Sequence, residues 1–315
     1  MTELLSLVDE EIERLLGVRT GREPAVLYEA AHHLLKASGK KVRSLLMLLA
    51  CISVGGTAED ALPFAAATEL IQTASLIHDD IIDDDSVRRG VTSTHLKYGT
   101  KIAVIAGDLL IALAVRIIGQ RAVPEVLQRL SECGIVMCEG EASDFLIDLS
   151  NPGHMTTSYY MSVVRSKTAS FMMGISQVGA LLGGGTDRQV EVLGEFGKMI
   201  GIAFQLRDDV LDVRSLQRDA DTSALSDLRH RRISYPLVYG LESSSDEVRA
   251  RAIRGLSMSD IEPALRMIDE TRAVEETVRL AKHYAEEARQ QLRDEELTRK
   301  DTLLALADFV VERLY

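Results

Sequence analysis

The chain has 315 residues, of which 46% are hydrophobic and 27% are charged, so it can bury a large core and is not a disordered segment. Aspartate and glutamate number 48 against 36 lysines and arginines, which gives a net charge of -12. Nucleic-acid binding needs a basic surface, so this composition excludes nucleic acid as the expected partner.

Alanine, leucine, glutamate and arginine recur at spacings of three and four residues along most of the chain, which predicts an all-α protein. The predicted helices, in chain order, are Thr2–Leu16, Ala25–Ala37, Val42–Val54, Ala61–Asp83, Lys101–Ile118, Pro124–Leu146, Thr157–Leu182, Arg188–Asp212, Ile233–Tyr239, Met258–Met267, Val274–Leu292 and Asp301–Leu314. The turn signals between them, such as Arg89-Gly90, are short. Several central helices are apolar on most faces, so we predict one large bundle and a single domain over residues 1–315.

We expect neither a transmembrane helix nor a secretory signal in this chain. Its longest apolar stretch, Ile102–Val115, contains Asp108 and is too short to cross a bilayer of about 30 Å. The first residues, MTELLSLVDEEIERLL, are acidic, whereas a secretory signal begins with basic residues. We therefore expect a cytoplasmic protein with no transmembrane segment. The three cysteines, Cys51, Cys133 and Cys138, lie in apolar helical patterns and are expected to be buried thiols, with no disulfide and no zinc site.

An aspartate-rich motif occurs twice. The first, LIHDDIIDDDSVRRG over residues 76–90, ends an apolar helix, and its aspartates three and four residues apart share a helix face. Such pairs repel each other unless a cation lies between them. The same spacing returns in FQLRDDVLD, over residues 204–212, again at the C-terminal end of an apolar helix, where the helix dipole adds to the attraction for cations.

The two motifs predict a Mg²⁺ site that binds a diphosphate. All-oxygen ligands favour a hard cation, and few carboxylates per ion favour Mg²⁺ completed by water and phosphate oxygens. A solvated helix end explains a single DDxxD equally well, so the duplication carries the prediction. His78 adjoins Asp79 but has apolar helical neighbours, which favours a core or supporting role over metal ligation. Basic segments, including GKKVR at residues 39–43, lie close to the aspartates and favour phosphate binding.

These motifs, in this order, resemble those of the trans-isoprenyl diphosphate synthases, which condense allylic diphosphates with isopentenyl diphosphate. GKKVR resembles the family's GKRxRP, LIHDDIIDDDSVRRG its first aspartate-rich motif, SKTAS its KT motif, and GIAFQLRDDVLD its second aspartate-rich motif. The likeness extends from about residue 25 to the C-terminus. It implies an all-α bundle around a deep central cavity, usually homodimeric.

The resemblance also implies a role for each matching residue. Mg²⁺ on the allylic diphosphate would be held by Asp79, Asp80, Asp83, Asp208, Asp209 and Asp212. Isopentenyl diphosphate would be bound by Lys40, Arg43, Gln72 and Arg89, where Gln72 stands at a position that is histidine in many members. The allylic diphosphate would face Arg88, Lys167, Thr168, Gln205 and Arg232.

The implied reaction breaks an allylic C–O bond while metal ions and basic side chains stabilise the charge on the departing diphosphate. Apolar walls exclude water from the carbocation, and no serine, cysteine or histidine nucleophile is required. Ala74 and Ser75, one turn before Asp79, are expected to point down the cavity and to limit product length. Both are small where short-chain members often carry an aromatic residue, so geranylgeranyl diphosphate or a longer product is predicted.

The chain departs from the family pattern after the second motif. Thr222 stands at a family lysine, Arg232 at a second lysine and Arg231 at a glycine, while Ser44 stands at the proline of GKRxRP. Arginine does not replace lysine equivalently at a phosphate site, so one cationic contact is lost unless Arg218 or Arg229 supplies it.

This departure leaves two further hypotheses open. One is a catalytically weak subunit that regulates another chain, against which the intact aspartates argue. The other is an all-α metal phosphohydrolase in which His32 or His33 joins His78 and Asp79, but it leaves the second motif unexplained. A terpene cyclase is less favoured, because such enzymes commonly lack the second full motif.

Overall fold

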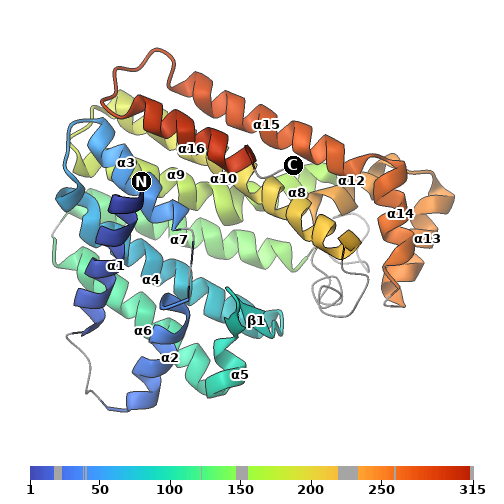
Figure 1. Ribbon diagram of the computed structural model, residues 1–315, viewed down its shortest axis with the longest axis horizontal. Helices are drawn as coiled ribbons and strands as arrows, with labels where there is room; N and C mark the ends of the chain where they lie inside the picture. Colours follow the sequence, from blue (N-terminus) through green and yellow to red (C-terminus); the bar gives the residue numbers. More distant parts are fainter. Residues whose placement is uncertain are drawn as a thin grey trace. The chain divides into compact units, whose positions relative to one another are not determined.

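The structure is a computed structural model that describes residues 1–17, 23–37, 39, 41–121, 123–146, 155–218, 233–258 and 260–312. These residues are helical almost throughout, which confirms the all-α prediction (Figure 1). The helices are α1 (Thr2–Gly17), α2 (Ala25–Leu35), α3 (Val42–Ser53), α4 (Ala58–Ile82), α5 (Thr94–Tyr98), α6 (Thr100–Gly119), α7 (Pro124–Asp144), α8 (Thr157–Val164), the π-helical turn η2 (Arg165–Ala169), α9 (Ser170–Leu182), α10 (Asp187–Arg218), α12 (Tyr235–Ser243), α13 (Asp246–Ser257), α14 (Glu262–Glu270), α15 (Ala273–Gln291) and α16 (Lys300–Glu312). Two short strands, β1 (Val87–Arg88) and β2 (Val91–Thr92), pair antiparallel.

The chain divides into two compact units, each built from separate stretches of sequence. The first comprises Met1–Arg129, Ile175–Val190 and Leu297–Arg299, and the second comprises Leu130–Gly174, Glu191–Glu296 and Lys300–Tyr315. The first aspartate-rich motif belongs to the first unit, and the second motif belongs to the second. A single domain over residues 1–315 stays a prediction.

Helix α4 is the centre of the first unit. It packs against α1, α3 and α6, and its alanines Ala65, Ala66 and Ala67 are fully buried, because small side chains let neighbouring helices come close (Figure 1). Thr57 and Asp60 form a capping box, with the Thr57 N–H donating to Asp60 Oδ2 at 2.8 Å. This cap starts the helix at Ala58, so the predicted start at Ala61 was three residues late. The helix ends at Ile82, inside the aspartate-rich motif.

The core of the second unit lies against α10. It contains Tyr160, Leu206, Val210, Val238 and Met267, and α12 contributes to it by packing against α8, α14 and α15. Leu206 and Val210 flank the two adjacent aspartates of the second motif on the same helix. The hydrophobic face of α10 therefore anchors the turn that carries these acidic side chains.

Several predicted boundaries were wrong. The predicted helix Thr157–Leu182 is interrupted by the π turn η2, and α10 continues past Asp212 to Arg218. The hairpin β1–β2 and the short helix α5 were not predicted, because elements of two to five residues give too short a pattern. Helix α13 was missed because half of the residues in its sequence, DEVRARAIRGLS, are charged or polar. Its start is marked by the Ser245 hydroxyl, which accepts from the Val248 N–H.

Two other expectations concern the burial of the cysteines and the absence of a transmembrane helix. Cys51 and Cys133 are buried as predicted, but Cys138 is exposed, because five residues along α7 turn the side chain about 140° away from the buried face of Cys133. Helix α6 has 20 residues and contains an 18-residue window with a mean hydropathy of 2.3, so by length and composition it could cross a membrane, although the stretch Ile102–Val115 alone is too short. Because a core helix of a soluble protein can have the same length and composition, this is weak support for a span. The expected absence of a transmembrane segment stays a prediction.

Candidate active site

The first aspartate-rich motif lies at the C-terminal end of α4 and is braced by the hairpin that follows. Arg89 and Gly90 both have positive φ, 52° and 77°, as the two central residues of a tight hairpin turn require. The turn brings Arg88 of β1 back onto the helix end. Arg88 Nε donates to Asp80 Oδ1 at 2.6 Å, and its Nη2 donates to Asp85 Oδ2 at 2.5 Å. The fully buried Asp80 is thus compensated by an ion pair.

The second motif lies within α10 and is also braced from one side. Asp209 is buried, with 3% of its surface exposed, and its Oδ2 accepts from the Tyr160 hydroxyl at 2.7 Å and from the Tyr235 N–H at 3.0 Å. Gln205 Nε2 donates to its Oδ1 at 3.1 Å. Burial raises the pKa of Asp209 to about 7; the three hydrogen bonds oppose this shift, and the charge of Asp212 adds to it.

The two motifs share one geometry. In each, the second aspartate points into the protein, where Arg88 holds Asp80 and Tyr160 holds Asp209. The first and last aspartates, four residues apart, share a face with each other, about 60° to 100° around the helix from the second aspartate. Asp79, Asp83 and Asp208 are half-buried and Asp212 is exposed, so solvent reaches these four carboxylates. Asp208 Oδ1 also accepts from the buried guanidinium of Arg207, at 2.5 Å from Nη2.

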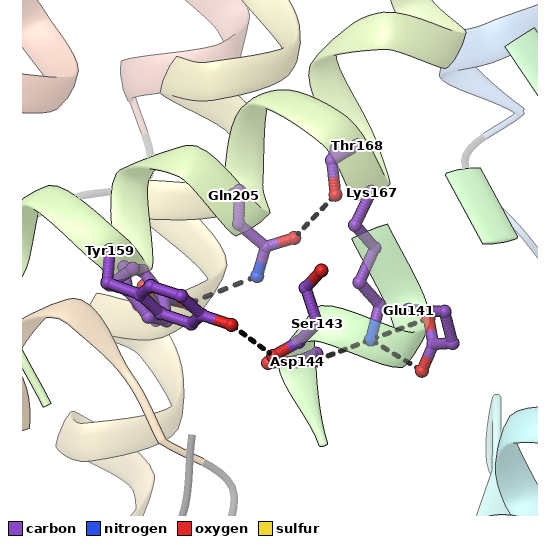
Figure 2. A network of polar contacts seen from close by, with 9 residues as sticks. Glu141, Ser143, Asp144, Tyr159, Lys167, Thr168 and Gln205 are labelled. Carbon is purple, nitrogen blue, oxygen red and sulfur yellow. Dashed lines mark hydrogen bonds and ion pairs between the residues drawn. The ribbon is translucent and has the colours of Figure 1, made fainter. Parts of the chain in front are cut away.

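The π turn η2 carries Lys167 and Thr168. Figure 2 shows Lys167 Nζ between Glu141 and Asp144, to which it donates at 2.9 and 2.8 Å. Burial lowers the pKa of Lys167, but the charges of Asp144 and Glu141 outweigh it and raise that pKa above its ordinary value. Thr168 Oγ1 donates to Gln205 Oε1 at 3.1 Å, which links the turn to Asp209 through one amide. Three predicted residues of the second unit are therefore joined by hydrogen bonds: Thr168, Gln205 and Asp209. The fourth, Lys167, is next to Thr168 in the sequence and forms its own ion pairs.

Two glycines permit this arrangement. A Cβ at Gly140 of α7 would lie 2.5 Å from the Lys167 backbone nitrogen, and a Cβ at Gly201 of α10 would lie 2.9 Å from the Ala169 Cα. Both helices can therefore pass the wide π turn at a distance that no larger residue allows. π turns of this kind occur often at functional sites, where they change the direction of a side chain.

The basic residues predicted to bind isopentenyl diphosphate belong to the first unit. The Arg89 guanidinium lies over Gly39, where a Cβ would be 3.1 Å from its Cζ, and Nη1 donates to the Leu34 carbonyl at 3.2 Å. Arg89 is thereby brought against the GKKVR segment. Arg43 and Gln72 are half-buried on α3 and α4. Lys40 and Arg232, both predicted to contact substrate, lie outside the described residues.

The remaining predicted residues lie on α4. Ala74 is fully buried, and Ser75 is half-buried with its hydroxyl donating to the Gln72 carbonyl at 2.9 Å. His78 faces α6, where its Nε2 lies 3.2 Å from the Val104 carbonyl oxygen and 3.8 Å from Asp108 Oδ1. These contacts agree with the supporting role expected for His78.

Four residues at the second motif were not predicted: Tyr160, Tyr235, Glu141 and Asp144. The tyrosines are too distant in sequence from Asp209 for any spacing to indicate the contact. Glu141 and Asp144, by contrast, are three residues apart on one face of α7. This spacing could have indicated that the two carboxylates bind one cationic side chain.

The raised pKa of Asp209 predicts how pH affects the metal-free protein. Asp209 has an ordinary pKa of 3.8 when unfolded but about 7 when folded, so the folded state binds more protons between these pH values. Its contribution to the free energy of unfolding therefore falls as pH rises from about 4 to about 7, by up to about 4 kcal/mol, and then levels off.

The variant Asp209→Asn tests this. Asparagine has the same size, and rotation of the Gln205 amide would let it hydrogen-bond to the new group. Urea unfolding is measured in the presence of EDTA at several pH values. As the pH rises from about 4 to about 7, the free energy of unfolding of the wild type is expected to fall relative to that of the variant. Asp246→Asn, at a side chain that is 98% exposed, is the control for general effects of removing a carboxylate. A stability difference that does not vary with pH would contradict the prediction.

The all-α fold and the two aspartate-rich helices agree with the resemblance to the trans-isoprenyl diphosphate synthases. The chain matches the polyprenyl synthetase family over residues 24–268 and belongs to it.

Individual relatives are similar along nearly the whole chain. The short chain isoprenyl diphosphate synthase of Methanothermobacter thermautotrophicus is 34% identical over 98% of this chain and 95% of its own length. The crystal structure of geranylgeranyl pyrophosphate synthetase from Pyrococcus horikoshii Ot3 superposes with a TM-score of 0.87 at 31% identity, covering 99% of this chain and 96% of that one. A decaprenyl diphosphate synthase from Rhodobacter capsulatus superposes with a TM-score of 0.89 at 28% identity, covering 100% and 97%.

Proposed function

We propose that the protein is a Mg²⁺-dependent trans-prenyltransferase that condenses isopentenyl diphosphate with an allylic diphosphate to give an all-trans prenyl diphosphate. The observation that carries this proposal is the duplicated motif with its repeated geometry, one aspartate buried and two facing solvent. Proteins whose names describe this chemistry match nearly the whole chain, and this supports the proposal.

The donor atoms fit Mg²⁺. Asp79 with Asp83, and Asp208 with Asp212, each offer two carboxylates four residues apart and accessible to solvent. Among the described residues, no group of three or more histidine, cysteine, aspartate or glutamate side chains is arranged as a complete metal site. Mg²⁺ is usually held by one or two carboxylates and keeps water and substrate oxygens as its other ligands, so a pair of aspartates at each motif is a sufficient donor set. When bound, Mg²⁺ acts as a Lewis acid that stabilises negative charge on a departing diphosphate.

The side chains of the protein supply the rest of the chemistry. In the proposed step the allylic C–O bond breaks, a bond forms from the allylic carbon to the double bond of isopentenyl diphosphate, and a proton leaves to the released diphosphate. Lys167 and Thr168 would face the allylic diphosphate, together with Arg88, Gln205 and Arg232. Isopentenyl diphosphate would be bound by Lys40, Arg43, Gln72 and Arg89. Groups already fixed by hydrogen bonds need little reorganisation when charge develops, which favours catalysis.

The product is proposed to be geranylgeranyl diphosphate or longer, since the small Ala74 and Ser75 leave the level below the first motif open. The names of the relatives, which range from short chain to decaprenyl, do not distinguish between lengths.

The purified protein tests the proposal directly. Incubated with Mg²⁺, isopentenyl diphosphate and each allylic primer in turn, it is expected to form a prenyl diphosphate that chromatography identifies as geranylgeranyl or longer. Turnover only after a second chain is added would instead indicate a regulatory subunit. Release of phosphate without isopentenyl diphosphate would indicate a phosphohydrolase.

We also propose that two copies of the chain associate through α6. This helix exposes Val104, Ile111 and Val115 at spacings of seven and four residues, with exposed fractions of 39%, 40% and 53%. An apolar stripe at this spacing on one helix suits a second copy of the same helix.

Ile111→Glu is therefore expected to convert a dimer to a monomer in sedimentation experiments, because the new charge would be buried without a partner. Arg116→Glu, at an exposed position on the same helix, is the control and should remain dimeric. A monomeric wild type, or a dimeric Ile111→Glu variant, would contradict this proposal.

A further inference from the structure

Glu69 is a buried carboxylate in the middle of α4 that belongs to neither aspartate-rich motif. Only 2% of its surface is exposed, and it lies between the buried residues Thr68 and Leu70. A buried carboxylate is costly unless hydrogen bonds and positive charges compensate it. Its surroundings therefore indicate its role.

Ser44 of α3 provides the hydrogen bond. Its hydroxyl oxygen lies 2.7 Å from Glu69 Oε1 and 2.9 Å from the Ala65 carbonyl oxygen, and Ser44 is itself fully buried. A hydroxyl carries one hydrogen, which a charged carboxylate attracts more strongly than a carbonyl does. Ser44 stands in the first turn of α3, directly after Arg43, so this bond ties α4 to the segment that carries the GKKVR basic residues.

The charge of Glu69 also affects Arg89. Burial lowers the pKa of Arg89, the charge of Glu69 opposes that shift, and the neighbouring Arg88 adds to it. Glu69 thus acts electrostatically on a guanidinium that the Leu34 carbonyl and the Gly39 backbone also confine. Gln72 follows Glu69 by three residues and so lies on the same side of α4. Of the three described residues proposed to bind isopentenyl diphosphate, Arg43 directly precedes Ser44, Gln72 lies one turn beyond Glu69, and Arg89 is affected by its charge.

We propose that Glu69, held by Ser44, is a positioning residue that fixes the basic side chains receiving the diphosphate of isopentenyl diphosphate. The inference rests on the proposed prenyltransferase function. Without the carboxylate, Ser44 loses its charged hydrogen-bond partner on α4 and Arg89 loses the negative charge of Glu69, so the basic side chains are no longer held in the geometry that a diphosphate needs.

The direction of the change in KM for isopentenyl diphosphate on Glu69→Gln distinguishes a positioning role from the effect of a distant negative charge. The negative charge of Glu69 repels an incoming diphosphate, so if it acted only as a distant charge, Glu69→Gln would tighten binding. If Glu69 positions the basic groups, Glu69→Gln raises the KM for isopentenyl diphosphate about tenfold or more, because a fixed charge-assisted contact is lost. The KM for the allylic substrate stays unchanged.

Steady-state kinetics with each substrate varied in turn, and calorimetric titration of isopentenyl diphosphate, test the proposal. Ser44→Ala is expected to raise the same KM by a smaller factor, and Ser44→Thr, which restores a hydroxyl, to reverse part of that rise. If Glu69→Gln does not fold, the Ser44 pair still tests the proposal. Thr68→Val removes a neighbouring buried hydroxyl that donates only within α4, to the Phe64 carbonyl at 3.0 Å, and is the matched control.

The outcomes are distinct. A wild type that condenses the substrates, with variants whose KM for isopentenyl diphosphate is unchanged or lower, would overturn the role of Glu69 and leave the proposed function intact. Equal rises in both KM values would also overturn it, because they indicate general damage. A wild type without condensation activity would overturn the proposed function, and the role of Glu69 with it.

Discussion

Replacement of Asp79 or Asp208 by asparagine is expected to lower the rate of condensation at least about a hundredfold, the cost of losing one electrostatic contact to a developing charge. Each substitution removes one carboxylate of a solvent-facing pair, so the motif can no longer hold a divalent ion firmly. Asparagine keeps the size of both side chains, which are partly exposed, so Asp79→Asn should leave the fold unaffected. Asp208→Asn also removes the charge partner of the buried Arg207, so a lower melting temperature is expected for that variant alone. Initial rates with saturating Mg²⁺, measured beside circular dichroism and melting curves, check this.

Asp84→Asn is the matched control for the first motif. Asp84 lies in the same acidic segment, its side chain is 82% exposed, and the substitution makes the same change of charge. Its φ of 52° lies in the left-handed region, which asparagine tolerates well. The control should keep nearly wild-type activity. Equal losses in Asp79→Asn and Asp84→Asn would mean that total charge, and not a defined metal site, explains the effect.

Ala74→Phe is expected to shorten the product by at least one isoprene unit. Ala74 lies one turn before Asp79 and is fully buried, so a phenyl ring there must occupy space below the first motif. If that space is the chain-elongation cavity, the ring blocks the growing prenyl chain. If it is packed core, the ring costs about 1–3 kcal/mol of stability and leaves the product unchanged. Chromatography of products made from one primer, together with melting curves, distinguishes these cases.

Leu76→Phe is the control for this substitution. Leu76 is half-buried on the same helix. It follows Ala74 by two residues, so its side chain points to nearly the opposite side of α4. Its product should match that of the wild type. A folded Ala74→Phe variant with an unchanged product would contradict the role of Ala74 in chain length.

Much of the fold could be predicted, because long helices have a regular apolar period. Helices such as α1, α3, α6 and α15 begin and end within one or two residues of their predicted limits. Errors arose where a local cap or turn decides the outcome, as at the Thr57 cap of α4. The π turn η2 leaves the apolar period of Thr157–Leu182 almost undisturbed, so the sequence pattern alone could not reveal it.

The candidate site was predictable to the extent that helix spacing determines it. A spacing of four residues already implies that Asp79 pairs with Asp83 and Asp208 with Asp212 on one face. Which aspartates are buried was not predictable, because this depends on partners from elsewhere in the chain. Tyr160 meets Asp209 across 49 residues, and Ser44 meets Glu69 across 25. Such contacts are set by tertiary packing, which no local pattern encodes.

The central proposal is that both aspartate-rich motifs hold metal ions on one allylic diphosphate. Crystals grown with Mn²⁺ and an unreactive allylic thiodiphosphate, measured at a wavelength where manganese scatters anomalously, test it most directly. We expect anomalous peaks within coordination distance of carboxylates from the Asp79–Asp83 pair and from the Asp208–Asp212 pair, with oxygens of the same diphosphate completing the ligands. Metal at neither motif, or metal-bound motifs that contact separate ligands, would contradict the proposed function.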